Sequence, residues 1–339
     1  MRGRTESKIK VESAIQSKLE TAPEYLVAFY YSLNQKTHMT KLRYIGNVIR
    51  YIEYLSGGNL EVSLDEIKKI NAFDIQKYMS DINYFDKADG VHEMSAATKA
   101  CIYSSLNAFF EFLVRNDYIK ASPFAGKKIE RPRIKENDIT FLTPEEVNAV
   151  QKQIFEGVGT DRAKAKQEKW KYRDLLLFRI PVVNGIRVNA LREIDIDDIH
   201  LNHGYIRVTE KGNITKNVYI DTETARLLRL WLARRSQLIG DSNCKALFIS
   251  NQRNRMTVMA IENIIKKYTE AVTSKHITPH KLRSTCGTNL YQAKKDIYLV
   301  ASVLGHKTTE PTRRYAKVFE TDKRNAVNVM GGLYAAPID

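Results

Sequence analysis

Apolar residues recur at helical spacing in two runs near the start of the chain. The period is close to that of an α-helix in both runs, with polar residues at the positions between. The first run comprises Leu42, Ile45, Val48, Ile49, Ile52 and Leu55, and the second comprises Ile102, Leu106, Phe109, Phe110 and Leu113. Each run predicts an amphipathic helix, and together they predict an all-helical N-terminal domain.

The second half of the chain mixes helical and strand patterns. Thr143-Pro144-Glu145-Glu146 has the sequence of a capping box with proline at the first helical position. Residues 204–220 alternate around a Lys-Gly-Asn turn, which predicts a β-hairpin with Lys211 at its tip. Residues 222–238 and 258–272 have helical spacing. We therefore expect a second domain that is mainly α with a small β-sheet.

The stretch 121–140 separates these two patterns. It holds two prolines, one glycine and many charges without an apolar period, which is typical of an extended linker. Two domains are therefore expected to meet near residue 130.

The charge of the chain limits the class of partner. Its 339 residues carry 54 Lys and Arg against 39 Asp and Glu, a formal net charge of +15, most of it after residue 140. Such a balance fits a polyanion, either nucleic acid or an anionic membrane surface. No stretch resembles a signal peptide or a membrane span, and three distant cysteines argue against a disulfide framework. We expect a cytoplasmic protein whose partner is nucleic acid.

Polar residues on the predicted N-terminal helices are candidate DNA contacts. They are Arg43, Asn47 and Arg50 at spacings i, i+4 and i+7, Lys41 near the start of the same helix, and Thr98 and Lys99 at the start of the second helix. A row of this kind either follows a phosphate backbone or is an ordinary solvated helix face. Nothing local decides between these two interpretations.

A third region concentrates chemistry at a predicted helix start. In Thr278-Pro279-His280-Lys281-Leu282-Arg283, threonine can cap the helix and proline can open it, so His280 and Arg283 share one face of the first turns. Free backbone N–H groups and a guanidinium suit a phosphate. The alternatives are a structural histidine, or a metal held by His276 and His280. A helix that begins at Pro279 breaks the common face of those two histidines, so we expect no metal.

Further motifs complete a constellation in the last third of the chain. In chain order the motifs are Gly185-Ile186-Arg187, Glu210-Lys211-Gly212-Asn213, His280-x-x-Arg283, Leu304-Gly305-His306 and Thr312-Arg313-Arg314-Tyr315. In this order and spacing they resemble the tyrosine recombinase (phage integrase) family. The resemblance covers nearly the whole chain after about residue 20.

The resemblance implies a site that cuts and rejoins a DNA strand. The implied catalytic residues are Arg187, Lys211, His280, Arg283, His306 and Tyr315. The two arginines would neutralise the phosphate, and Tyr315 would attack it to give a 3′-phosphotyrosyl ester. Strands would then be exchanged through a Holliday junction, and the scheme needs no cofactor and no metal.

The remaining roles follow from the same resemblance. His280 would accept the proton of the tyrosine, Lys211 would protonate the leaving 5′ oxygen, and His306 would position the phosphate. Lys216 is a second hairpin lysine, and Lys211 is preferred because it lies in the Lys-Gly-Asn turn typical of the family. One departure is Ala190, because family members commonly have an acidic residue three places after the first arginine.

The resemblance also implies a two-domain DNA clamp. Its expected parts are an extension at 1–20, a helical core-binding (SAM-like) domain at 21–122, a linker at 123–140, a catalytic domain at 141–317 and a tail at 318–339. The tail would dock on a neighbouring subunit or pack on its own domain. The implied partners are double-stranded DNA core sites, a homo-tetramer on synapsed DNA, and accessory DNA-bending or directionality factors.

The biological role is expected to be integration or excision of a mobile element or phage in a bacterial, phage or archaeal setting, on nucleoid DNA. Two other functions remain open. A type IB topoisomerase would use similar chemistry to relax DNA, and a noncatalytic DNA-binding module could use the same scaffold.

Overall fold

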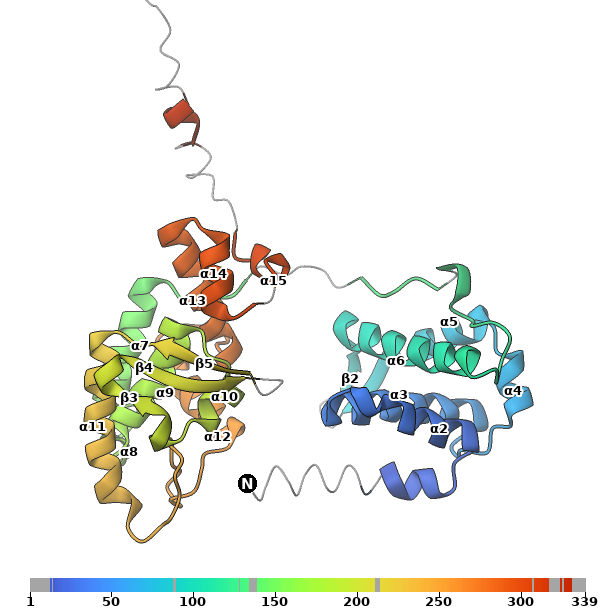
Figure 1. Ribbon diagram of the computed structural model, residues 1–339, viewed down its shortest axis with the longest axis horizontal. Helices are drawn as coiled ribbons and strands as arrows, with labels where there is room; N and C mark the ends of the chain where they lie inside the picture. The colour runs from blue at the N-terminus through green and yellow to red at the C-terminus, as the bar shows by residue number, and fades with distance from the viewer. Residues whose placement is uncertain are drawn as a thin grey trace, which may run out of the picture. The chain divides into compact units, whose positions relative to one another are not determined.

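The computed structural model describes residues 13, 15–87, 90–127, 129–133, 139–210, 214–306, 308–316, 324 and 326–330. The chain divides into two compact units, Met1–Asn137 and Asp138–Asp339. Each unit has its own hydrophobic core. Helices dominate both units and a three-stranded sheet lies in the second (Figure 1), which confirms the predicted fold class.

The N-terminal unit is a set of helices around one core. Its elements are α2 (Glu24–Ser32), α3 (His38–Ser56), α4 (Leu64–Lys69), α5 (Ala72–Asp81), β1 (Tyr84–Lys87), β2 (Gly90–Glu93) and α6 (Ala96–Arg115). The long helices α3 and α6 pack against each other (Figure 1). Both predicted apolar runs are buried in this core apart from Leu55, which is partly buried.

This unit differs from the prediction in one element, because it is not entirely helical. β1 and β2 pair antiparallel, with Tyr84 opposite Glu93 and Lys87 opposite Gly90. The residues of β2 are exposed or half-buried, and Val91 is 70% exposed. Since no residue of the short strand β2 is buried, its sequence carries no alternation of apolar and polar residues that would predict a strand.

The N-terminal core also includes part of the stretch predicted as linker. Phe124 and Ile129 are buried in it. The Tyr103 hydroxyl on α6 donates a 3.2 Å hydrogen bond to the Ile129 carbonyl. These two isolated apolar residues therefore belong to the helical unit, although they form no periodic pattern.

The C-terminal unit packs a small antiparallel sheet against helices (Figure 1). The strands are β3 (Ile199–His200), β4 (Tyr205–Glu210) and β5 (Ile214–Tyr219), in the spatial order β3-β4-β5. The helices are α7 (Pro144–Glu156), α8 (Asp161–Glu168), α9 (Lys171–Asn184), α10 (Val188–Glu193), α11 (Thr222–Ile239), α12 (Val258–Glu270), α13 (Pro279–Lys294), α14 (Ile297–Leu304) and α15 (Glu310–Arg313).

Several local predictions in this unit are confirmed. Thr143 and Glu146 form a reciprocal capping box at the start of α7, with Pro144 at the first helical position. The strands of the predicted hairpin pair from Tyr205 opposite Tyr219 to Glu210 opposite Ile214. Its tip, residues 211–213, lies outside the described residues.

Helix α9 lies at the centre of the C-terminal unit. It packs against α7, α11, α12 and α13, and its residues from Leu175 to Phe178 are buried. Arg179, the next residue along the helix, forms a 2.6 Å ion pair with Asp221. In the described part of the chain, no helix has the length and apolar character needed to cross a membrane.

Candidate active site

The first predicted arginine follows a tight turn at the end of α9. Gly185 ends the helix with φ +64°, a conformation that favours glycine. A Cβ on Gly185 would clash with Leu304 Cδ2, so glycine lets the end of α9 pack directly on α14. Arg187 then stands as the N-cap residue of α10. The turn therefore places Arg187 beside the Leu304-Gly305-His306 motif.

The second arginine connects two of the motifs through its guanidinium. Thr278 caps α13 and Pro279 opens it, as predicted. Arg283, 2% exposed, donates from Nη1 to the Gly185 carbonyl and from Nη2 to the Leu304 carbonyl, each at 2.5 Å. Buried backbone carbonyls need such donors. Arg283 therefore holds the segments that precede Arg187 and His306 at a fixed separation.

His306 is held by the helix that precedes the tyrosine. Its Nδ1 lies 2.7 Å from Oγ1 of Thr312, which is fully buried on α15. Burial and then the charges of Arg283 and Arg187 lower the pKa of His306 to about 4. The imidazole is therefore neutral near pH 7, and Thr312 fixes the position of its ring.

His280 lies on the first turn of α13 and is exposed. Partial desolvation, followed by the charges of Arg314 and Arg283, lowers the pKa of His280. A neutral imidazole can accept a proton, which suits the general-base role that the sequence predicts.

Tyr315 follows the short helix α15 and is 3% exposed. Its ring belongs to a small apolar cluster with Cys286, Val300 and Leu304. A Cβ on Gly287 would lie 3.0 Å from the ring atoms Cδ2 and Cε2, so the ring rests directly on the backbone of α13. Tyr315 is also among the groups that influence the pKa of Arg283. The ring is thus packed in place within the electrostatic range of Arg283.

The hairpin contributes Glu210 and Lys216 to this region. The predicted catalytic lysine, Lys211, lies outside the described residues. Lys216 on β5 forms a 3.0 Å ion pair with Glu210, the last residue of β4, and Glu210 also forms an ion pair with Arg187. A Cβ on Gly305 would lie 2.6 Å from Lys216 Nζ, so this lysine lies next to the motif that carries His306.

The structure therefore gathers most of the predicted catalytic residues in the C-terminal unit. Those it describes are Arg187, His280, Arg283, His306 and Tyr315. Sequence analysis did not identify Glu210 or Thr312. The signal for Glu210 was present, since it directly precedes the predicted lysine in a chain that has Ala190 where an acidic residue is common.

The comparisons with known proteins identify the family. The model of the phage integrase family matches residues 142–322, which is more than half of the chain. The chain belongs to this family. It is a tyrosine-type site-specific recombinase.

Several relatives are similar over most of their length. Tyrosine recombinase XerS of Streptococcus equi subsp. zooepidemicus is 25% identical over 90% of this chain and 95% of its own. XerS of Streptococcus uberis is 24% identical with the same coverage.

Solved structures share the fold. A XerH site-specific recombinase bound to a palindromic difH substrate has a TM-score of 0.68 at 20% identity, over 95% of this chain and 88% of its own. A lambda integrase dimer bound to a COC′ core site has a TM-score of 0.62 at 17% identity, over 93% and 98%. The Tn1549 transposon integrase in complex with a circular intermediate DNA has a TM-score of 0.65 at 17% identity, over 90% and 99%.

The candidate DNA contacts of the recombinase on α3 need one correction. Arg43 and Arg50 are exposed, but Asn47 is only 8% exposed. Its Nδ2 donates a 3.0 Å hydrogen bond to Oγ of Ser105 on α6. Asn47 was assigned to a solvated polar face from its spacing alone, and that placement is wrong because its side chain bridges the two long helices. Its contact with DNA stays a prediction.

All six candidate DNA contacts of the N-terminal unit remain predictions. Lys41 Nζ lies 3.7 Å from the ring centroid of Tyr30 and donates to Asn34 at 3.1 Å. Thr98 is exposed, and its hydroxyl lies 2.9 Å from that of Ser95, the N-cap residue of α6.

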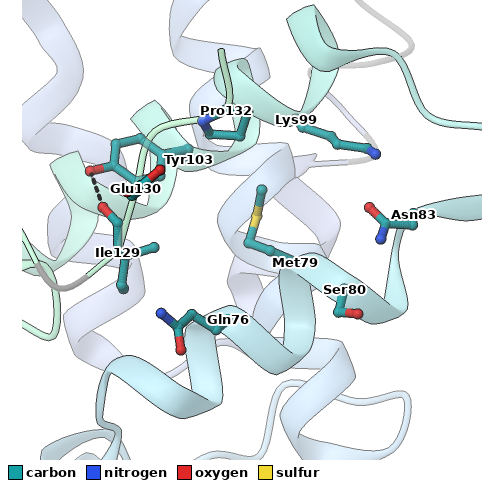
Figure 2. A pocket seen from close by; sticks show the side chains of 9 residues that line it. All are labelled: Gln76, Met79, Ser80, Asn83, Lys99, Tyr103, Ile129, Glu130 and Pro132. Carbon is teal, nitrogen blue, oxygen red and sulfur yellow. Dashed lines mark hydrogen bonds between the residues drawn. The ribbon is translucent and has the colours of Figure 1, made fainter.

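Lys99 borders a surface pocket of about 550 Å³ within the N-terminal unit. Figure 2 shows Lys99 and Asn83 at one end of this pocket and Tyr103 and Ile129 at the other. The lysine forms a 3.3 Å ion pair with Glu93 of β2. The pocket lies between α5, α6 and residues 129–132, all of the N-terminal unit.

The burial of Asn47 and the exposure of Arg50 predict opposite effects for two alanine variants. Asn47→Ala is expected to lower the free energy of unfolding by about 1–3 kcal/mol, because Ser105 loses a buried partner, without changing DNA affinity. Arg50→Ala is expected to keep stability and to reduce the slope of log affinity against log salt by about 1. Urea unfolding and filter binding of the full chain measure both. An Asn47→Ala variant of unchanged stability that loses DNA affinity would reinstate the original assignment.

Proposed function

We propose that this recombinase cleaves and rejoins double-stranded DNA at core sites through a 3′-phosphotyrosyl intermediate and exchanges strands through a Holliday junction. The observation that carries the proposal is the convergence of two arginines, two histidines of lowered pKa and one tyrosine from four separate motifs. A packed core does not need such a concentration of cationic and titratable groups. A phosphodiester under attack does.

The two arginines are proposed to neutralise the non-bridging oxygens of the scissile phosphate. A guanidinium stays charged at any working pH and offers a fork of donors to phosphate oxygens. Arg187 is well placed for this, since its side chain is 41% exposed. Arg283 would add its positive charge from its buried position, while its Nη atoms donate to the Gly185 and Leu304 carbonyls.

Cleavage would proceed by in-line attack of the Tyr315 oxygen on phosphorus. The tyrosine proton passes to His280, the bond from phosphorus to the 5′ oxygen breaks, and Lys211 supplies a proton to that oxygen. The ester retains the energy of the broken bond, so the 5′ hydroxyl of another strand can reverse the step without ATP or a metal.

His306 is proposed to bind the same phosphate. With the Thr312 hydroxyl donating to Nδ1, the neutral ring carries its proton on Nε2 and can donate a hydrogen bond to an oxygen. The lowered pKa of His306 supports the neutral ring.

The proposed partners are DNA core sites and three further copies of the chain. The XerH and lambda integrase structures named above are bound to DNA sites, which supports the first of these. In the tail, residues 326–330 are helical, and Val327, Val329 and Met330 are exposed, which supports docking on another subunit. The other apolar points of the tail, Phe319 and Leu333, lie outside the described residues.

The biological role is proposed to be integration and excision of a mobile element or phage on nucleoid DNA, with accessory DNA-bending or directionality factors. The fold shared with the Tn1549 transposon integrase agrees with this role.

A plasmid assay tests the proposed function. A supercoiled plasmid that carries two copies of the core site should give recombinant products, whereas a plasmid without the site should keep its supercoils. Efficient relaxation of the plasmid without a site would instead indicate a topoisomerase. A nicked suicide substrate that yields no covalent adduct would indicate a DNA-binding module.

The two hairpin lysines can be distinguished by the leaving group. Lys211→Ala is expected to slow cleavage by about 10²- to 10⁴-fold, the range for loss of a general acid. A substrate with a 5′-bridging sulfur needs no protonation on departure and should restore the rate. Lys216→Ala serves as the matched variant and should show no such restoration. Restoration with Lys216→Ala but not with Lys211→Ala would reverse the assignment.

A further inference from the structure

Glu210 lies among the cationic groups of the site without any role in the chemistry above. Its carboxylate accepts from Arg187 Nη1 and forms a 3.0 Å ion pair with Lys216 Nζ. Its charge also acts on Arg283 and His306, where it opposes the effect of the neighbouring arginines on both pKa values. A single carboxylate thus connects the hairpin with the start of α10.

The exposure of the three side chains shows on which side this carboxylate lies. The Glu210 side chain is 11% exposed, whereas those of Arg187 and Lys216 are 41% and 29% exposed. Glu210 therefore contacts the two cations from the protein side and leaves their outer donors accessible. If the carboxylate occupied the place of the phosphate, Glu210 would be more exposed than Arg187 and Lys216.

The local sequence explains why the hairpin must supply this carboxylate. Ala190, three positions after Arg187 on α10, is 6% exposed and offers only a methyl group. In the described part of the chain, the carboxylate within ion-pair distance of Arg187 is that of Glu210. A long, half-exposed arginine loses rotamer freedom when it is held, and a fixed partner on a strand removes that freedom before DNA arrives.

We propose that Glu210 is a positioning residue that fixes Arg187 and Lys216 for the scissile phosphate. This inference rests on the proposed function, because it concerns how the same site is organised. Glu210 touches neither the phosphate nor the tyrosine. It acts by holding the guanidinium, which then neutralises a non-bridging oxygen.

The test compares Glu210→Gln with wild type in single-turnover cleavage of a nicked suicide substrate. Glutamine keeps the shape and removes the charge, so the variant is expected to fold and to bind core DNA within about twofold of wild type. Cleavage is expected to be about 10- to 100-fold slower, the range for loss of a supporting partner or a misplacement near 1 Å. Glu210→Asp, which keeps the charge on a shorter side chain, should fall between the two.

A second substrate separates positioning from a general loss of structure. A methylphosphonate at the scissile position has no charge on its non-bridging oxygen, so a well-placed guanidinium contributes less to its cleavage. The defect of Glu210→Gln should therefore shrink to less than about threefold on this substrate. The control is Glu223→Gln, which removes a surface carboxylate paired with Arg226 at 2.7 Å and should behave as wild type on both substrates.

Three results would overturn the inference. The first is unchanged cleavage by Glu210→Gln. The second is faster cleavage or tighter DNA binding, which would mean that the carboxylate competes with the phosphate. The third is a defect of equal size on the charged and uncharged substrates. Failure of the wild-type protein to cleave the suicide substrate would contradict the proposed function and is thereby distinguishable.

Discussion

A Tyr315→Phe variant is expected to bind core DNA like wild type and to cleave it at least about 10⁴-fold more slowly, the scale seen when a covalent nucleophile is removed. The change removes one oxygen. The ring packs on Gly287 and in the cluster with Leu304, and phenylalanine makes the same contacts. The free energy of unfolding should therefore hardly change. Single-turnover cleavage of a suicide substrate and a gel-shift titration measure the two properties.

Tyr291→Phe is the matched control for this variant. Tyr291 lies on α13 and packs, partly buried, against the same cluster as Tyr315. Since its hydroxyl has no role in the proposed reaction, its loss should leave cleavage within about twofold of wild type. If cleavage survives in Tyr315→Phe and disappears in Tyr291→Phe, the nucleophile is Tyr291 and the assignment to Tyr315 is wrong.

Arg283→Lys is expected to have the second largest effect, a loss of cleavage of about 10²-fold or more. Lysine keeps the positive charge but cannot reach the Gly185 and Leu304 carbonyls together. The segments that carry Arg187 and His306 would lose their common anchor. The free energy of unfolding should fall by about 1–3 kcal/mol, because one buried carbonyl is left without a donor. Suicide-substrate kinetics and urea unfolding give the two values.

Arg235→Lys tests whether the loss at position 283 is only a loss of stability. Arg235 on α11 is 6% exposed and donates to two backbone carbonyls, those of Ala246 and Cys244, in the same way as Arg283. Its replacement should lower stability by a similar amount but leave cleavage near wild type. Equal loss of cleavage in both variants would mean that Arg283 acts through the fold alone.

The motifs of the site were predictable because they lie at the ends of secondary structure elements. Thr278 and Pro279 are typical of a helix start and begin α13, and the spacing then puts His280 and Arg283 on the same face. Gly185 and Gly305 mark the ends of α9 and α14. Such signals depend on local backbone chemistry, which a sequence displays directly.

The features that the sequence did not predict depend on contacts between distant segments. Asn47 has the spacing of a polar face, yet Ser105, 58 residues later in the chain, makes it a buried bridge. In the sequence Glu210 and Thr312 are ordinary polar residues, and only the fold brings them to Arg187 and His306 respectively. The strand β2 has no buried residue and so carries no apolar pattern that would predict it. Pairing across the fold cannot be recovered from spacing alone.

The most direct measurement is to map the covalent adduct between the recombinase and DNA. Wild-type protein is trapped on a nicked suicide substrate, the complex is digested with protease and nuclease, and the modified peptide is sequenced by mass spectrometry. We predict one nucleotide-bearing residue, Tyr315, joined to the 3′ phosphate of the cleaved strand. An adduct on any other residue, attachment to the 5′ end, or cleavage without an adduct would contradict the account.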